Sequence, residues 1–162
     1  MPFSSLGLTA PLLANIAKSG YTAPYPIQTA AVPAILAGKD ILGIAQTGSG
    51  KTAGFVWPIL QQFQQKNAAP NRHIKALILV PTRELAVQVG EVFSVFSRNL
   101  PRPVKSLAVY GGVSINPQMI QLRGVEILVA TPGRLLDLVD NNALQLSETD
   151  ILVLDEADKM LN

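Results

Sequence analysis

The sequence contains no cysteine and only one histidine among its 162 residues. The absence of cysteine excludes disulfides and thiolate metal sites, and it fits a reducing cytoplasm, which is the location that we expect. No apolar run approaches the ~18 residues that cross a membrane, and residues 1–5 show no start of a signal peptide. Hydrophobic residues make up 48% of the chain, which is therefore long and apolar enough to bury the core of one domain.

A strong net charge is also lacking, because the chain carries only +2 at pH 7. The charge is unevenly distributed, however. Residues 1–123 hold 11 Lys and Arg against three acids, a balance of +8, whereas residues 124–162 hold two bases against eight acids, a balance of −6. An uneven surface explains this asymmetry as well as a nucleic-acid partner does, so charge alone leaves both interpretations open.

Short continuous apolar runs alternate with helical patterns along the chain. The runs predict strands at Asp40–Ala45, Ala76–Val80, Ser106–Tyr110, Glu126–Ala130 and Ile151–Leu154. The patterns predict helices over Ala10–Lys18 with Thr9 as its cap, from Pro26 onward, and over Lys51–Gln65, Thr82–Arg98, Gln118–Leu122 and Arg134–Val139. This alternation predicts an α/β fold with a mostly parallel sheet, helices on both faces, and ligands at the carboxyl ends of the strands.

The first stretch with chemical content is Ala45-Gln46-Thr47-Gly48-Ser49-Gly50-Lys51-Thr52. It follows a predicted strand and opens a predicted helix, as a phosphate-binding loop does. Its glycines allow backbone N–H groups to turn toward a phosphate, while Lys51 is expected to reach the β- and γ-phosphates and Thr52 to hold Mg²⁺. Ala45 stands where this pattern usually begins with glycine. A glycine-rich turn without a ligand is the weaker alternative, because GKT lies between a strand and a helix.

The second such stretch is Ile151-Leu152-Val153-Leu154-Asp155-Glu156-Ala157-Asp158, a strand that looks fully buried and ends on carboxylates. In enzymes with a phosphate-binding loop, an acid at the end of a neighbouring strand holds Mg²⁺, and Asp155 has that place. Glu156 follows it and is expected to orient or deprotonate the attacking water. A strand end with solvated acids is the alternative, and the loop at residues 45–52 weakens it.

Asp155-Glu156-Ala157-Asp158 reads DEAD, and over essentially its whole length the chain resembles the DEAD-box ATP-dependent RNA helicases. Gly20-Tyr21-Thr22-Ala23-Pro24-Tyr25-Pro26-Ile27-Gln28 looks like the adenine-reading Q motif, with Phe3 as its upstream aromatic residue and Tyr25 in place of the usual Thr. Pro81-Thr82-Arg83-Glu84-Leu85, Gly111-Gly112 and Thr131-Pro132-Gly133-Arg134 look like the RNA-backbone motifs. The stretch from Val109 to Gln118 further resembles the bacterial RhlE-type subgroup.

The resemblance implies that ATP and Mg²⁺ are the cofactors and that RNA is bound through its backbone with little sequence preference. The implied nucleotide ligands are Phe3, Tyr21, Gln28 and the loop from Ala45 to Thr52, with Asp155 sharing Mg²⁺. The implied RNA ligands are Pro81, Thr82, Arg83, Gly111, Gly112, Thr131, Pro132, Gly133 and Arg134. Asp158 is implied to couple the ATP state to the rest of the enzyme. Helix capping and turn formation explain each RNA motif taken singly, whereas three in this order favour RNA.

The family's helicase core has two RecA-like domains, so the resemblance implies that residues 1–162 are the first of them, truncated before its last strands. Residues 1–38 are then the Q-motif segment and residues 39–162 the nucleotide- and RNA-binding core. Without the second domain, we expect nucleotide binding but negligible ATP hydrolysis and no unwinding. We also expect a vacancy in the sheet that favours self-association. The alternative function is a non-catalytic, ATP-gated module that clamps RNA, which the intact Lys51 and Glu156 make less favoured.

Overall fold

The computed structural model describes residues 2–43, 50–67 and 70–161. The chain forms two compact units. The first, here called the helical unit, comprises Met1–Asn67 and Val92–Pro103, and the second, the sheet unit, comprises Ala68–Glu91 and Val104–Asn162. These units reflect which residues pack together in space. They do not test the predicted division into a Q-motif segment (residues 1–38) and a core (residues 39–162), which stays a prediction. No helix in the described ranges is both long enough and apolar enough to cross a membrane.

The helical unit is built from helices that start where the sequence predicts. It contains the 3₁₀ turn η1 (Phe3–Ser5), α1 (Ala10–Lys18), α2 (Pro26–Leu36), α3 (Lys51–Phe63) and the last residues of α4 (Arg83–Phe96). Proline at the first turn of α1 and of α2 costs no hydrogen bond there. The predicted cap at Thr9 is wrong in its bonding, because both the backbone N–H and the hydroxyl of Thr9 donate to Gln61 Oε1, at 3.0 and 2.9 Å.

An aromatic cluster forms the core of the helical unit. Trp57 is fully buried and meets three rings edge to face, with centroid distances of 5.5 Å to Phe3, 5.3 Å to Tyr21 and 5.5 Å to Phe96. Such pairs contribute about 0.5–1.5 kcal/mol each beyond the area they bury. The cluster therefore ties η1 and the loop after α1 to α3, with Trp57 at its centre.

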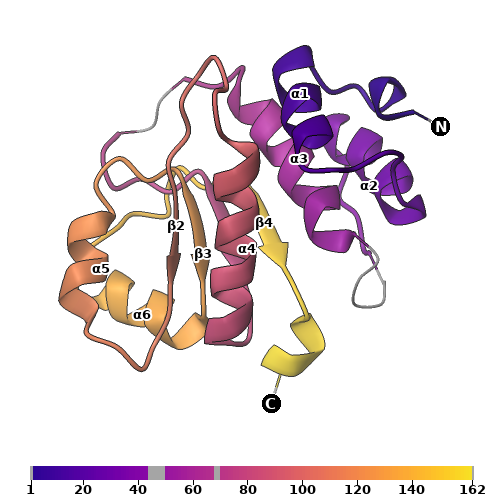
Figure 1. Cartoon of the computed structure of the whole chain (residues 1–162). Helices are drawn as coiled ribbons and strands as arrows, with labels where there is room; N and C mark the ends of the chain where they lie inside the picture. Colours follow the sequence, from indigo (N-terminus) through magenta and orange to yellow (C-terminus); the bar gives the residue numbers. More distant parts are fainter. Residues whose placement is uncertain (1, 44–49, 68–69, 162) are drawn as a thin grey trace. The chain divides into compact units, whose positions relative to one another are not determined.

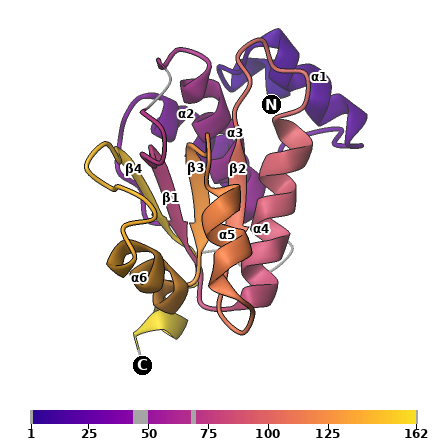
Figure 2. The ribbon, with the colours of Figure 1, turned by 90° about the vertical axis from the view of Figure 1, so that its left-hand side faces the viewer.

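The sheet unit contains a four-stranded parallel sheet in the order β2-β3-β1-β4. Its elements are β1 (Ala76–Leu79), the first residues of α4, β2 (Ser106–Val109), α5 (Ile115–Gln121), β3 (Ile127–Ala130), α6 (Pro132–Asp140), β4 (Ile151–Leu154) and the 3₁₀ turn η2 (Ala157–Met160). Figures 1 and 2 show α5 and α6 on one face of the sheet and α4 on the other. The predicted parallel sheet with helices on both faces is confirmed.

The two faces of the sheet are filled in different ways. Aliphatic side chains of β1, β2 and β3 pack with those of α5, α6 and the following loops on one face, in a cluster of Ile74, Leu77, Val109, Leu122, Val125, Leu128, Ala130, Leu135, Leu138, Ala143 and Leu144. On the other face α4 approaches β2 closely, because a Cβ at Gly90 would lie 3.0 Å from the Cβ of Ala108. Glycine therefore sets the distance between this helix and the sheet.

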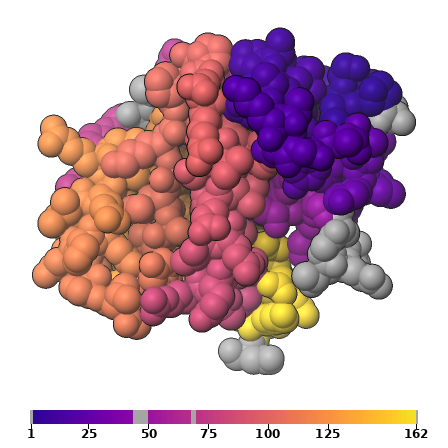
Figure 3. All heavy atoms as spheres, in the orientation of Figure 1, coloured from indigo at the N-terminus to yellow at the C-terminus, as the bar shows by residue number. Residues whose placement is uncertain are grey.

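Two strand predictions need correction. Residues 40–43 of the predicted first strand form no ladder, and Leu42 is 89% exposed, while residues 44 and 45 lie outside the described residues. A strand exists only with a paired neighbour, and residues 40–43 have none among the residues that the structure describes. Strand β4, expected to be buried, pairs only with β1 among the described strands, and Leu152 and Leu154 are 60% and 53% exposed. It is an edge strand, and Figure 3 shows the yellow segment that contains it at the surface.

Candidate functional site

Four of the predicted motifs follow the four strands of the sheet unit directly. The strands are parallel and in register, with Leu79 opposite both Ala130 and Leu154, and Val109 opposite Ala130. Their carboxyl ends therefore meet at one edge, in the order Gly111-Gly112, Thr131 to Arg134, Pro81 to Arg83, and Asp155 to Asp158. Strands lie about 4.8 Å apart, so the three candidate RNA motifs span roughly 10 Å.

The strand ends are joined by bonds beyond the ladder. Thr131 N–H donates to the carbonyl of Val109 at 3.3 Å, and Asp155 N–H donates to the carbonyl of Leu79 at 3.0 Å. The Arg83 guanidinium lies over the ring of Tyr110, 5.1 Å from its centroid, which links the motif after β1 to the segment after β2. The edge is therefore a connected surface to which each motif contributes.

The two threonines of the candidate RNA motifs are used differently. Thr82 Oγ1 accepts a hydrogen bond from Leu85 N–H at 3.2 Å and so caps α4. Thr131 occupies the N-cap position of α6, but its side chain makes no capping bond. Helix capping thus accounts for Thr82, whereas Thr131 fills its position without that role.

The glycines of the edge lie in open space. No atom lies within 4 Å of the Cβ that would be added at Gly111, Gly112 or Gly133. Gly112 has φ +82°, a backbone conformation that favours glycine, whereas the other two have ordinary φ values. Packing therefore does not require glycine at these positions, and the open space permits a ligand to approach the backbone closely.

The structure places Arg134 inside the protein. Its side chain is 8% exposed, Nη1 donates to Gln118 Oε1 at 2.8 Å, and Nη2 donates to the carbonyl of Val113 at 2.8 Å. Its Nε lies 3.6 Å from a carboxylate oxygen of Asp137, an ion-pair distance that is too long for a hydrogen bond. Sequence reasoning did not single out Gln118 as a functional residue, because nothing in the α5 pattern separates it from a packing position.

The acidic segment after β4 combines burial with an unusual backbone. Asp155 is 4% exposed, whereas Glu156 is half-buried and has φ +53° and ψ +48°, a left-handed conformation that costs about 1–2 kcal/mol for a residue with a side chain. Lys159 Nζ lies 2.6 Å from Glu156 Oε1, and this hydrogen bond together with the negative charge of Glu156 raises the pKa of Lys159. Asp158 lies exposed in η2.

The phosphate-loop candidate is described from Gly50 onward, while Ala45, Gln46, Thr47, Gly48 and Ser49 lie outside the described residues. Gly50 has φ +81° and precedes α3, which begins at Lys51 as predicted. A Cβ at Gly50 would collide with the side chains of Gln28 and Tyr25. Lys51 and Thr52 lie in the first turn of α3, where the backbone N–H groups and the helix dipole favour an anion.

Gln28 connects the start of α2 to the start of α3. It is fully buried, its Oε1 accepts from Tyr25 N–H at 3.0 Å, and its Nε2 donates to the carbonyl of Gly50 at 3.2 Å. An amide has two acceptor sites and two donor protons, so one of each remains for a purine edge. Burial means that a base reaches this amide only after a local rearrangement.

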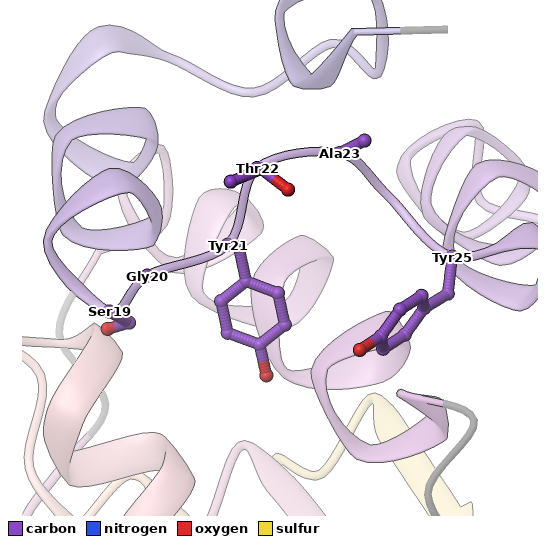
Figure 4. A pocket seen from close by; sticks show the side chains of 6 residues that line it. All are labelled: Ser19, Gly20, Tyr21, Thr22, Ala23 and Tyr25. Carbon is purple, nitrogen blue, oxygen red and sulfur yellow. The ribbon is translucent and has the colours of Figure 1, made fainter.

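A hollow of about 330 Å³ lies in the loop between α1 and α2 and is lined by Ser19, Gly20, Tyr21, Thr22, Ala23 and Tyr25. Figure 4 shows the rings of Tyr21 and Tyr25 extending from this loop toward the same side. The hollow is at the small end of the range for ligand pockets, about 300–1,000 Å³. Phe3 packs edge to face against Tyr21, with 6.3 Å between the ring centroids. The structure thus brings the predicted aromatic residues together and adds Tyr25.

The comparisons with known proteins agree on one family. The family model described as DEAD/DEAH box helicase matches residues 25–162. The chain is 48% identical over its whole length to the DEAD-box ATP-dependent RNA helicase CshA of Streptococcus pneumoniae, of which it covers 30%. It is 49% identical over 98% of its length to the ATP-dependent RNA helicase DeaD of Escherichia coli, of which it covers 25%. The chain thus spans less than a third of the length of these relatives.

Solved structures show the same fold. A DEAD box protein from Methanococcus jannaschii matches the whole chain with a TM-score of 0.90 and 39% identity, and the chain covers 43% of it. The RNA helicase Prp28 from Chaetomium thermophilum, bound to ADP, matches 99% of the chain with a TM-score of 0.86 and 38% identity, with 39% of that protein covered.

Proposed function

This chain belongs to the DEAD/DEAH box helicase family, and from that premise we propose that it is the first RecA-like, ATP-binding domain of an ATP-dependent RNA helicase. The observation that supports this function best is the common edge of the sheet. All four predicted motifs of the sheet unit lie at this edge, because each follows one of four parallel strands that are in register. Ligands of parallel α/β sheets bind at this edge. In the whole enzyme, ATP and RNA together would close the two domains, and this closure would bend and locally separate an RNA duplex. ATP hydrolysis would then release the RNA.

On this proposal the phosphate chemistry is divided among a few side chains. Lys51 would contact the β- and γ-phosphates, Thr52 and Asp155 would hold Mg²⁺ partly through water, and Glu156 would position the attacking water. The residues fit these groups, because Lys51 and Thr52 open a helix and Asp155 is a carboxylate held at a strand end by its backbone bond to Leu79. Mg²⁺ would neutralise charge that develops on the phosphates.

Adenine would be bound by the aromatic hollow and read by Gln28. Tyr21 and Tyr25 offer π-faces, Phe3 supports Tyr21, and the remaining donor and acceptor of Gln28 match the N6 and N7 edge of adenine. The loop from Ala45 to Ser49 would complete the nucleotide site. Gln28 would then act after a rearrangement that exposes its amide.

RNA would be bound through its backbone at the edge formed by Pro81, Thr82 and Arg83, by Gly111 and Gly112, and by Thr131, Pro132 and Gly133. Arg134, the fourth residue of the last motif, is buried and would support this edge from inside the protein. The open space above the glycines and the single aromatic ring at this edge, Tyr110, favour contact with phosphate and sugar over stacking of bases. Asp158 would couple this edge to the ATP state. The finer assignment to the bacterial RhlE-type subgroup rests on residues 109–118 and belongs to the same proposal, as does a cytoplasmic location.

Nucleotide selectivity tests this function, and Trp57 supplies an internal reporter. It is the only tryptophan of the chain, and its ring lies 5.3 Å from that of Tyr21. We expect ADP with Mg²⁺ to change Trp57 fluorescence saturably and to release heat in calorimetry, whereas GDP does neither. Tyr21→Ala should abolish the response, and Lys18→Ala, on the exposed surface of α1, should not. Equal binding of ADP and GDP would contradict adenine reading by Gln28.

The isolated chain should bind nucleotide, hydrolyse ATP negligibly and leave RNA duplexes intact, because the second RecA-like domain of the family supplies the arginines that act on the γ-phosphate. Substantial RNA-stimulated ATP turnover by the 162 residues alone would contradict this expectation. A non-catalytic RNA clamp remains the second candidate. It predicts ATP-dependent RNA retention by a longer form of the protein without any turnover.

We also propose that the isolated chain self-associates at β4. This strand pairs only with β1 among the described strands, and it exposes Leu152 and Leu154 beside a row of unpaired backbone groups. Such edges pair with other chains. Analytical ultracentrifugation should show concentration-dependent dimers that Leu152→Lys abolishes, while Leu136→Lys, at an exposed position of α6, leaves them unchanged. A strictly monomeric chain at high concentration would contradict the proposal.

A further inference from the structure

The segment after β2 is held from both sides by two buried polar side chains. Gln118 Nε2 donates to the carbonyl of Tyr110 at 3.2 Å, and Arg134 Nη2 donates to the carbonyl of Val113 at 2.8 Å. The same two side chains are bonded to each other, because Arg134 Nη1 donates to Gln118 Oε1 at 2.8 Å. Gly111 and Gly112 therefore lie between two carbonyls that a single Gln–Arg pair fixes.

Because Gln118 and Arg134 are buried, their polar atoms need hydrogen-bond partners within the protein. Gln118 is 6% exposed and Arg134 is 8% exposed, so a polar atom of either side chain that lost its hydrogen bond would destabilise the protein. The nearest acidic partner of the guanidinium, Asp137, has a side chain that is 60% exposed and lies 3.6 Å from Nε. The best hydrogen bonds of Arg134 thus go to the neutral groups that hold the loop. Its planar fork has fixed geometry, so it positions both acceptors at once.

The loop that the pair holds is not held by packing. The added Cβ positions at Gly111 and Gly112 have no neighbour within 4 Å, and both residues are exposed. The Gly112 backbone at φ +82° is accessible to glycine, but glycine also populates many other conformations. Hydrogen bonds to the flanking carbonyls are therefore what selects one loop conformation from the many that two adjacent glycines allow.

The pair also connects the three strand ends that carry the candidate RNA motifs. Arg134 lies in the first turn of the helix after β3, and Gln118 and the two carbonyls belong to the segment after β2. The guanidinium of Arg83, from the segment after β1, lies over the ring of Tyr110. Contacts thus link the three strand ends that carry the candidate RNA motifs, and they pass through the backbone carbonyl and the ring of Tyr110. A change at Gln118 would be transmitted to both neighbours.

We propose that Gln118 is a positioning residue for RNA, which together with Arg134 fixes the Gly111–Gly112 loop in the conformation that receives the RNA backbone. This inference rests on the proposed RNA-binding function and deepens it. Arg134 then acts on RNA through the loop that it holds. An RNA backbone that contacts a pre-ordered loop does not bear the cost of ordering it, so the pair raises affinity without touching the ligand.

The test compares variants of the 162-residue chain. Gln118→Leu removes both bonds of the amide, whereas Gln118→Glu keeps an acceptor for Arg134 but loses the donor to Tyr110. Gln121→Leu, at an exposed position of the same helix, is the matched control. Binding of a ten-nucleotide single-stranded poly(U) RNA is followed through the backbone amide NMR signals of Gly111 and Gly112 and through fluorescence anisotropy, at a temperature where all variants are folded.

We expect the Gly111 and Gly112 signals of the unmodified chain to shift on RNA addition. Gln118→Leu should weaken RNA binding about tenfold and broaden these two signals in the free protein, because the loop is then ordered only when RNA binds. Gln118→Glu should weaken binding less, and Gln121→Leu should not change it. If Gln118→Leu does not fold, Gln118→Glu still decides the question through the same two signals.

Two different results would overturn the proposal. If the Gly111 and Gly112 signals shift with RNA but Gln118→Leu and Gln118→Glu bind as tightly as Gln121→Leu, the pair is structural only, and the RNA-binding function stands. If RNA leaves the two signals unchanged in the unmodified chain, or does not bind, the proposed RNA edge itself is wrong and the role of Gln118 falls with it.

Discussion

The two units of this chain differ most in their aromatic residues. Of five Phe, three Tyr and one Trp, eight lie in the helical unit, and Tyr110 is the only one in the sheet unit. The helical unit packs rings around Trp57 and presents Tyr21 and Tyr25 beside a hollow, whereas the sheet unit has an aliphatic core and exposes glycines at one edge. Rings suit a flat base, and an open backbone suits a phosphate chain, so the division matches two kinds of ligand chemistry.

The largest expected effect tests whether the rings hold the helical unit together. Trp57→Ala should lower the free energy of unfolding by about 3–5 kcal/mol, because it removes a fully buried side chain with three ring contacts. Trp57→Phe should cost no more than about 1 kcal/mol, since it also removes Nε1, a buried donor without a hydrogen-bond partner among the described residues. Urea unfolding measures both. Equal losses for the two variants would show that the indole itself is required.

Gly50 tests the other tightly packed point of the helical unit. Gly50→Ala should destabilise the chain by about 2–4 kcal/mol, because left-handed backbone strain adds to a collision with Gln28 and Tyr25. Gly20→Ala is the matched control, since Gly20 has φ +85° but no neighbour within 4 Å, and it should cost about 1 kcal/mol. Equal losses in thermal unfolding would mean that the crowding at Gly50 is relieved by movement of Tyr25.

The sequence could predict most of the sheet edge, because each motif directly follows a continuous apolar run and parallel strands in register bring their carboxyl ends together. It was wrong about Leu152 and Leu154, because an apolar run carries no information about which strand lies at the edge. It also missed the Gln118–Arg134 pair, because the sequence does not show whether an arginine side chain is buried in the protein or exposed to a phosphate ligand. The predicted roles of Lys51, Asp155 and the RNA motifs stay predictions.

Gly112 is the counterpart of Gly50 in the sheet unit, with nearly the same φ but open surroundings. Gly112→Ala should cost about 1 kcal/mol of stability, as Gly20→Ala does, because only backbone strain is involved. It should weaken RNA binding several-fold, whereas Gly20→Ala leaves RNA binding unchanged. Anisotropy with single-stranded poly(U) RNA measures the difference. Unchanged RNA affinity in Gly112→Ala would contradict close approach of the backbone at this glycine.

The smallest expected effect concerns the ion pair between Lys159 and Glu156, 2.6 Å apart at the exposed end of the sheet unit. Lys159→Gln should not change unfolding measurably between pH 6 and 9, because exposed pairs are screened by water. The pKa of Lys159 is raised in the folded protein, so folding favours the charged form of this side chain. The ion pair therefore contributes its full stabilisation below the ordinary pKa of 10.5, and this stabilisation is lost only at higher pH. Unfolding of both chains at pH 8 and pH 11 checks this sign. A difference between the two chains that is larger at pH 11 than at pH 8 would contradict it, and would mean that Lys159 stabilises this strand end by packing.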